Sequence, residues 1–370
     1  MSVKYAQKKS RLTLKRFFPV PKYLNLPTVG IDISDRSVKF LEFAYEDGRR
    51  VLGRYGERGI SEGIMAKGMI QQVEALAEIL GKLKDDEHLH AIRASLPEEH
   101  AYIFQTVIPA DTDYTQARNI LEFQLEEHVP IPSQDAIFDY EVLENPLQDR
   151  AHVHVAVSVY SKGIVNAYLS AFTLAGLLPL SIEMEASAMA RAVVQEGDKG
   201  TYLLVDFGRM RTGIAIVTGA SPHFTSTVSV GSHPISQAIE KHLNASPEEV
   251  VRFKNNIGLT EPKKNQELYM AMMGAASVLK DEIEKHLMYW RTRKSVAGES
   301  VSPAEKIILC GGGANLAGLV EYLSGNLRLP VVIGNVWQNA FSFDDTIPEI
   351  DRAHSLGYGT AIGLALRQEP

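Results

Sequence analysis

The chain has 370 residues, 45% of them hydrophobic and 22% charged, which is typical of a soluble globular protein. Its one cysteine, Cys310, excludes a disulfide framework and a cysteine-based metal centre, and favours a reducing cytoplasm. The net charge is −7 although the first 26 residues hold seven lysines and arginines and no acid, so the acidic remainder argues against nucleic-acid binding.

Residues 1–27 are predicted to form a basic, flexible tail that ends in a proline-rich stretch. Large apolar side chains such as Phe17 and Phe18 lie among its basic residues, so contact with an anionic membrane surface is one interpretation. A solvated, disordered tail is the other. No apolar run predicts a transmembrane helix or a signal peptide.

Residues 28–60 have the alternating pattern of strands, residues 71–83 that of a helix and residues 91–96 that of a short strand. A segment with a different pattern of predicted elements follows. It predicts, in order, a strand at 102–108, a helix at 113–128, strands at 136–143 and 152–160, and a helix at 162–176. We interpret this strand–helix–strand–strand–helix segment as a compact inserted module.

The rest of the chain alternates strands and helices. A strand at 180–185 precedes a helix at 186–195, and residues 200–219 form a hairpin. Ser246 and Glu249 have the spacing of a capping box at the start of a helix. The remaining predictions are helices at 234–242, 247–254, 267–290, 319–323 and 355–367, and strands at 307–310 and 331–334.

Two hairpins share one plan, in which an apolar strand ends in an aspartate, crosses a short polar turn and re-enters a β-branched strand. The aspartates, Asp32 and Asp206, lie about half the chain apart, so the repeat predicts two similar lobes that face each other. Backbone N–H groups in such turns can hold phosphate oxygens, and an aspartate at each strand end could hold Mg²⁺ through water. Taken singly, either hairpin is explained as an ordinary edge hairpin.

Gly311, Gly312 and Gly313 follow the apolar strand at 307–310. Glycines at such a place allow the backbone to approach a flat ligand closely, or they form a plain turn into the next helix. The pattern is neither a dinucleotide-binding fingerprint nor a P-loop.

Taken in order, these features resemble the actin-like ATPases of the FtsA/PilM group, most closely the PilM family, which acts in the cytoplasm in type IV pilus assembly. The resemblance covers residues 28–370. It is carried by the segments 29–39, 127–132, 183–191, 206–208, 246–254, 311–316 and 361–365.

The resemblance implies a two-lobed actin-like α/β fold, made of duplicated RNase H-like domains with an inserted βαββα (SHS2-like) subdomain. The first lobe would comprise residues 28–96, 180–199 and 353–370, and the insert residues 97–179. The second lobe would be 200–352, with a small helical subdomain around 245–300.

The family's nucleotide site, carried over by position, implies ATP or ADP with Mg²⁺ as cofactors. The first phosphate hairpin would consist of Asp32, Ser34, Ser37 and Lys39, and the second of Asp206, Gly208 and Thr212. Asp32 and Asp206 would hold Mg²⁺ through water. Adenosine would face Gly311, Gly312, Gly313, Asn315 and, from the long helix, Lys285. Glu183 or Glu185 would orient the attacking water, or would simply be acids at a strand end.

Two departures from the family pattern bear on activity. Ser34 stands where the family usually has glycine, and a positive φ would be costly there. Arg209 and Arg211 stand where small residues are usual, and they could neutralise a terminal phosphate or fill its place. We therefore expect nucleotide binding with slow or absent hydrolysis.

The resemblance also implies partners. The insert, around residues 100–178, would bind the cytoplasmic tail of a PilN-like inner-membrane protein and so hold the chain at the inner membrane. Pilus assembly ATPases and self-association are further expectations. The alternatives are a sugar or acetate-type kinase on the same fold and a scaffold that binds no nucleotide. A short C-terminus without an amphipathic membrane helix disfavours FtsA itself.

Overall fold

The structure is a computed structural model that describes residues 28–143, 151–261, 266–294 and 300–367. The basic tail at 1–27, with its suggested membrane contact, lies outside these residues. None of the described helices combines the length and apolarity needed to cross a bilayer.

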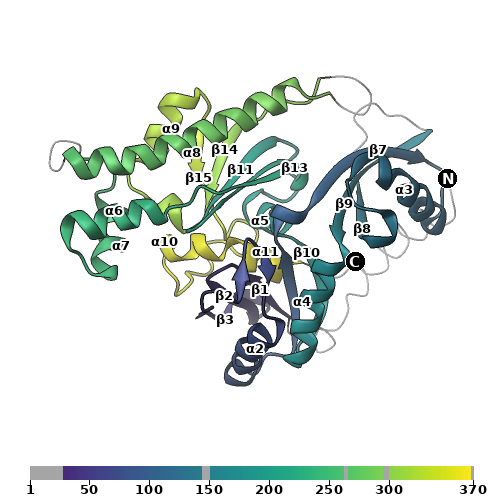
Figure 1. The fold of residues 1–370 in the computed structure, drawn as a ribbon, viewed down its shortest axis with the longest axis horizontal. Helices are drawn as coiled ribbons and strands as arrows, with labels where there is room; N and C mark the ends of the chain where they lie inside the picture. Colours follow the sequence, from purple (N-terminus) through teal and green to yellow (C-terminus); the bar gives the residue numbers. More distant parts are fainter. Residues whose placement is uncertain (1–27, 144–150, 262–265, 295–299, 368–370) are drawn as a thin grey trace.

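Two five-stranded sheets have the same strand order and directions, and Figure 1 shows them as the cores of two lobes. The order in the first sheet is β10-β6-β1-β2-β3. The second sheet, read in the same direction, has the order β15-β14-β11-β12-β13. The first comprises β1 (Thr28–Ile33), β2 (Ser37–Glu46), β3 (Arg49–Gly59), β6 (Ala91–Leu96) and β10 (Leu178–Met184). The second comprises β11 (Thr201–Phe207), β12 (Thr212–Thr218), β13 (Ser221–Val228), β14 (Lys306–Cys310) and β15 (Val331–Ile333).

This equivalence confirms the predicted duplication and the actin-like fold. It extends to the turns, because Asp47-Gly48 and Gly219-Ala220 both have two residues with positive φ and join equivalent strands. Such two-residue turns match the twist of paired strands. β13 was not predicted from its mostly polar sequence, although its counterpart in the first lobe, residues 49–60, was.

The insert is a three-stranded sheet in the order β7-β9-β8, with α3 packed against it. Its elements are β7 (Tyr102–Pro109), α3 (Tyr114–His128), β8 (Ala136–Val142) and β9 (His152–Ser161), and η3 (Ser133–Asp135) links α3 to β8. Asp113 begins α3 with a capping box that pairs it with Gln116.

The helix α4 (Lys162–Leu174) is predicted as part of the insert, but its buried side belongs to the core of the first lobe. Tyr168 and Phe172 are fully buried there, and α4 packs beside α2 (Val73–Glu87). The helix therefore serves as the crossover between the parallel strands β6 and β10, and the insertion interrupts that crossover. This is a correction to the predicted module.

The helices α5 (Glu185–Val193) and α11 (Gly359–Leu366) cross between the lobes at the centre of Figure 1. α11 returns to β1 and β2 of the first sheet, whereas α5 packs against β12 and β13 of the second. A Cβ at Gly363 would lie 1.7 Å from the carbonyl oxygen of Ala188, so only glycine permits this crossing. The pair joins the two cores.

The remaining elements complete the lobes. They are β4 (Met65–Ala66), β5 (Met69–Ile70), η2 (Glu98–His100), α6 (His233–Leu243), α7 (Pro247–Asn256), α8 (Gln266–Thr292), η4 (Gly312–Asn315), α9 (Leu319–Leu327), α10 (Arg352–Ser355) and η5 (Leu356–Tyr358). The capping box of Ser246 and Glu249 is confirmed at the start of α7.

Candidate functional site between the lobes

Asp32 and Asp206 occupy equivalent places, because β1 and β11 each form the centre of their sheet and each ends next to its aspartate. The two carboxyl groups are close enough for the charge of Asp32 to affect the pKa of Asp206. Burial first, and then the charge of Asp32, raise the pKa of Asp206 to about 6. Burial also raises the pKa of Asp32, while Lys39 and a hydrogen bond from Ser95 oppose the rise. The structure thus brings the two predicted aspartates together.

The first hairpin uses its own donors. The N–H of Ser34 donates to the carbonyl oxygen of Ser37 at 2.9 Å, and the N–H of Ser37 donates to Oγ of Ser34 at 3.1 Å. Ser34 has no positive φ, so the expected cost of serine does not arise. Ser34 closes this turn in place of glycine. Lys39 reaches from β2 toward the ring of Tyr358, 5.9 Å from its centroid.

In the second hairpin, Gly208 is required by a close backbone approach. A Cβ there would lie 2.8 Å from the carbonyl oxygen of Arg211. Thr212 is fully buried, and its hydroxyl donates to the carbonyl oxygen of Val230 at 2.5 Å. The structure therefore gives Thr212 a structural role within the second lobe, and this corrects its assignment to a phosphate contact.

The glycine turn packs tightly against the second hairpin. A Cβ at Gly311, whose φ is 79°, would lie 2.3 Å from Oδ1 of Asp206, and one at Gly313 would lie 2.6 Å from Phe207. Gly312 differs because it is exposed and nothing lies within 4 Å of a Cβ there. Two of the three glycines are thus explained by packing, and Gly312 faces open space.

Asn315 and Lys285 have local partners. The amide of Asn315 donates to the carbonyl oxygen of Ala353 at 2.7 Å and so ties η4 to α10. Lys285 lies on the exposed side of α8, where it pairs with Glu282 at 3.4 Å. It is not among the residues that line the cavity between the lobes.

Glu183 and Glu185 have different environments. Both carboxylate oxygens of Glu183 accept from Arg191 at 2.7 Å, and Arg367 adds a third bond at 2.6 Å. This saturated carboxylate joins β10, α5 and the chain after α11, which corrects its prediction as a water-orienting acid. Glu185 instead begins α5 and lines a cavity of about 20 Å³, room for one or two water molecules.

The same cavity is lined by Glu98 and Asp206. Glu98 belongs to η2, directly after β6, and is almost fully buried. Burial first, and then the charge of Asp206, raise the pKa of Glu98 to about 8. Burial likewise raises the pKa of Glu185 well above its usual value. At neutral pH the carboxyl group of Glu98 is therefore mostly protonated.

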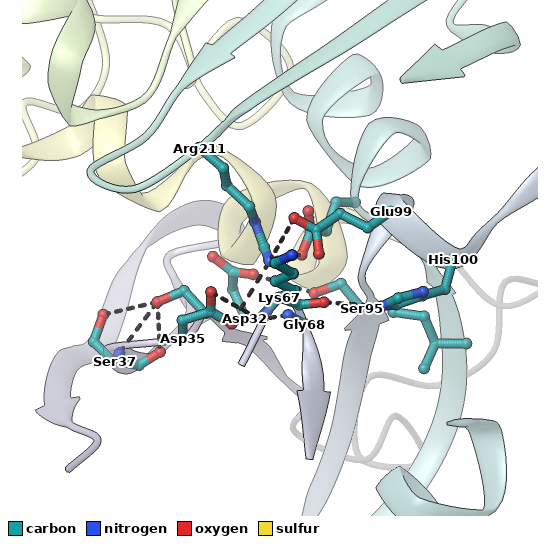
Figure 2. A network of polar contacts seen from close by, with 12 residues as sticks. Asp32, Asp35, Ser37, Lys67, Gly68, Ser95, Glu99, His100 and Arg211 are labelled. Carbon is teal, nitrogen blue, oxygen red and sulfur yellow. Dashed lines mark hydrogen bonds and ion pairs between the residues drawn. The ribbon is translucent and has the colours of Figure 1, made fainter. Parts of the chain in front are cut away.

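Arg211 reaches from the second hairpin to three acids of the first lobe, two of which, Asp35 and Glu99, are labelled in Figure 2. Its guanidinium nitrogens lie 3.3 Å from Glu99, 3.6 Å from Asp35 and 3.7 Å from Glu185. Although burial acts to lower it, these charges hold the pKa of Arg211 above its usual value. The side chain is 17% exposed, so the arginine is an ion bridge between the lobes.

Asp35 is held independently of Arg211. The backbone N–H groups of Gly68 and Lys67 donate to its carboxylate at 2.8 and 3.2 Å. The carbonyl oxygen of Gly68 accepts from the Tyr168 hydroxyl, and that of Lys67 contacts His100. Figure 2 shows this network beside Arg211.

Lys254 lies near the other end of the second hairpin. Burial first, and then the charge of Arg209, lower the pKa of Lys254. Its carbonyl oxygen accepts from the N–H of Ala317, just after the glycine turn. Two cations therefore lie close together, as expected of a site for an anionic ligand.

Sequence reasoning did not assign Glu98 and Glu99 to the site. The signal was present, because Pro97-Glu98-Glu99 directly follows a short apolar strand. β6 runs parallel to β1, so both strands end at the same edge of the sheet, beside Asp32. Across the described residues, no three His, Cys, Asp or Glu side chains are grouped so as to hold a metal ion by themselves.

Comparison with known proteins agrees with this architecture. Among solved structures, one from a PilM-PilN type IV pilus biogenesis complex has a TM-score of 0.72 at 20% identity, covering 92% of this chain and 98% of that chain. The ethanolamine utilization protein EutJ from Carboxydothermus hydrogenoformans has a TM-score of 0.52 at 15% identity, with 94% and 91% covered. Both likenesses concern the fold.

The sequence as a whole matches the profile of the family described as type IV pilus assembly protein PilM, over residues 30–369. This match spans both lobes, the insert and the cavity between the lobes. The chain therefore belongs to the PilM family of type IV pilus assembly proteins.

Proposed function

We propose that the chain binds ATP with Mg²⁺ between its lobes and acts as a nucleotide-dependent component of the type IV pilus assembly platform. The observation that carries this proposal is the pairing of Asp32 and Asp206 at equivalent strand ends, where Asp206 also lines the cavity between the lobes. Two hairpins that close from opposite lobes present donors and carboxylates to a single polyphosphate.

Mg²⁺ would be held through water by Asp32 and Asp206 and directly by the phosphates, since Mg²⁺ keeps much of its hydration shell. The raised pKa of Asp206, about 6, supports this role. A divalent cation can replace the protons that now offset the charge of the buried carboxyl groups.

Adenosine would lie beside the exposed backbone of Gly312, near Lys254 and Asn315. The proximity of Lys254 and Arg209 supports a phosphate of the nucleotide nearby, because two cations close together favour an anion. We retain Lys285 only as a weaker candidate, since it pairs with Glu282 on the exposed side of α8.

Hydrolysis would be slow or absent. Glu185 is the acid best placed to orient water, because it lines the cavity and Glu183 is saturated by arginines. Burial raises the pKa of Glu185, and Arg211 lies 3.7 Å away. Burial favours the protonated form of Glu185, which cannot accept a proton from water, and the ion pair with Arg211 makes the ionised form a weaker base.

The partner surface would be the insert. The solved structure of a PilM-PilN complex, whose fold this chain shares, supports a PilN-like inner-membrane protein as the partner and the inner membrane as the location. Phe123 of α3 is 89% exposed and Tyr114 is 57% exposed, and exposed apolar side chains of this size often mark contact surfaces.

Thermal unfolding of the full chain with and without ATP and Mg²⁺ tests nucleotide binding. Ligand at a hundred times its Kd stabilises the folded state by about 2.7 kcal/mol, so the Tm should rise measurably. Asp206→Asn and Asp32→Asn should reduce the rise. The control Asp281→Asn, on the exposed side of α8, should keep it.

An unchanged Tm, together with no retention of ATP in equilibrium dialysis, would contradict the proposal and favour a scaffold. Sugar-dependent ADP formation would instead favour a kinase.

Calorimetric titration with the cytoplasmic tail of the PilN-like protein from the same organism, with and without ATP, tests the partner. Phe123→Ser should weaken that binding if α3 forms the contact.

A further inference from the structure

Arg211 of the second lobe is held less tightly than Arg54 and Arg191 of the first lobe. Arg54 forms two bonds of 2.7 and 2.8 Å with Glu42, and Arg191 forms two of 2.7 Å with Glu183. The carboxylates around Arg211 lie at 3.3 to 3.7 Å. Its Nη1 is buried without a hydrogen-bond partner in the described structure, as is Oε2 of Glu99.

A buried guanidinium with an unused donor favours a ligand that offers two acceptors in one plane. Arginine forms its strongest contacts as paired N–H···O bonds to carboxylate or phosphate. None of the three acids around Arg211 provides such a pair. A phosphate group would provide such a pair of acceptors. The two aspartate hairpins predict that a phosphate binds beside Arg211.

The three acids differ in what compensates their charge when Arg211 moves away. Asp35 keeps two backbone N–H donors, from Lys67 and Gly68. Glu185 has a raised pKa and can take up a proton when the guanidinium leaves. Glu99 is left with an unpaired oxygen in either case. The ion bridge is therefore an exchangeable contact.

We propose that Arg211 distinguishes a triphosphate from a diphosphate: its guanidinium leaves Asp35, Glu99 and Glu185 and pairs with the terminal phosphate. The proposal rests on the proposed function, since it assumes a nucleotide bound between the lobes. It predicts that substitutions of Arg211 and of Glu99 change the preference for the triphosphate in opposite directions. Arg211 favours the triphosphate, and Glu99 competes with the triphosphate for Arg211.

The test is isothermal titration of the full chain with ATP·Mg²⁺ and with ADP·Mg²⁺. A lost bidentate contact to a charged group corresponds to roughly tenfold or more in affinity. Arg211→Ala should therefore lower the ratio of ATP to ADP affinity about tenfold, and Arg211→Lys should lower it less. Glu99→Gln should raise the ratio, because Arg211 then loses a competing carboxylate.

Arg58→Ala, which removes an exposed arginine paired with Asp86 on the surface, is the control and should leave the ratio unchanged. Equal changes in both affinities in Arg211→Ala would overturn the inference, as would a collapse of the ratio in Arg209→Ala instead. If Arg211→Ala fails to fold, an unchanged ratio in Arg211→Lys together with Glu99→Gln would overturn it. Failure of the proposed function looks different, since neither nucleotide would then bind the unaltered chain.

Discussion

The acidic residues that line the cavity are buried and lie close to one another, and both conditions raise their pKa values. Glu98 is the clearest case, because its pKa of about 8 in the folded chain exceeds the ordinary value of 4.5. The folded chain therefore holds a proton that the unfolded chain has released at neutral pH. Stability from this group is complete below pH 4.5 and is lost as the pH rises through 8.

Glu98→Gln tests this linkage. The free energy of unfolding of the unaltered chain should fall between pH 6 and pH 8, by up to about 1.4 kcal/mol per pH unit from Glu98. The variant should show a flatter profile in urea unfolding at pH 6, 7 and 8. Glu78→Gln, on the exposed side of α2, should keep the original slope. Parallel profiles for Glu98→Gln and the unaltered chain would rule out the raised pKa.

Whole elements depend on a few close approaches, of which the crossing of α5 and α11 is the tightest. Gly363 faces Ala188 across this crossing, and Gly30 of β1 faces Ala361. These glycines are required by contacts between segments far apart in the sequence. A glycine-containing closing helix was predicted, yet its partner helix could not be read from spacing.

Gly363→Ala should destabilise the chain by about 1–3 kcal/mol or more, because the added methyl group would force the two helices apart. Gly274→Ala is the matched control. Gly274 lies on the exposed side of α8 with nothing within 4 Å of its Cβ position, so alanine should stabilise by up to about 1 kcal/mol. Urea unfolding measures both. Similar effects in the two variants would contradict the close crossing.

At the scale of the molecule, the insert contacts the second lobe through β13. Gln105 of β7 donates to Nδ1 of His223 in β13 at 2.5 Å, and Ser221 donates to Glu141 of β8 at 3.2 Å. Burial first, and then the charge of Arg293, lower the pKa of His223 to about 4. The folded contact therefore keeps His223 neutral, as its role as acceptor requires.

Acid should weaken this docking. Stability from a histidine with a lowered pKa is present above pH 6.5 and lost as the pH falls towards 4. Amide exchange in β7 and β13, corrected for intrinsic rates, should quicken by up to roughly tenfold per pH unit below 6.5. His223→Gln should remove this dependence. Equal acid sensitivity in the variant would show that His223 does not control the docking.

Local patterns were sufficient for the duplicated hairpins, the family, most of the helices and strands, and the capping box at Ser246. Each depends on residues a few positions apart, where periodicity and turn chemistry act. The same patterns predicted Asp32 and Asp206 as partners, because a repeated strand–aspartate–turn places equivalent residues at equivalent ends. Family membership followed from the same segments, and the profile match confirms it.

Contacts across the fold decided the rest. Glu183 and Glu185 are two positions apart, yet one is saturated by Arg191 and Arg367 while the other lines the cavity. Arg211 meets Asp35 and Glu99 only because the two lobes close on each other. Charge, burial and pKa depend on neighbours in space, and sequence spacing does not encode which distant side chains become neighbours.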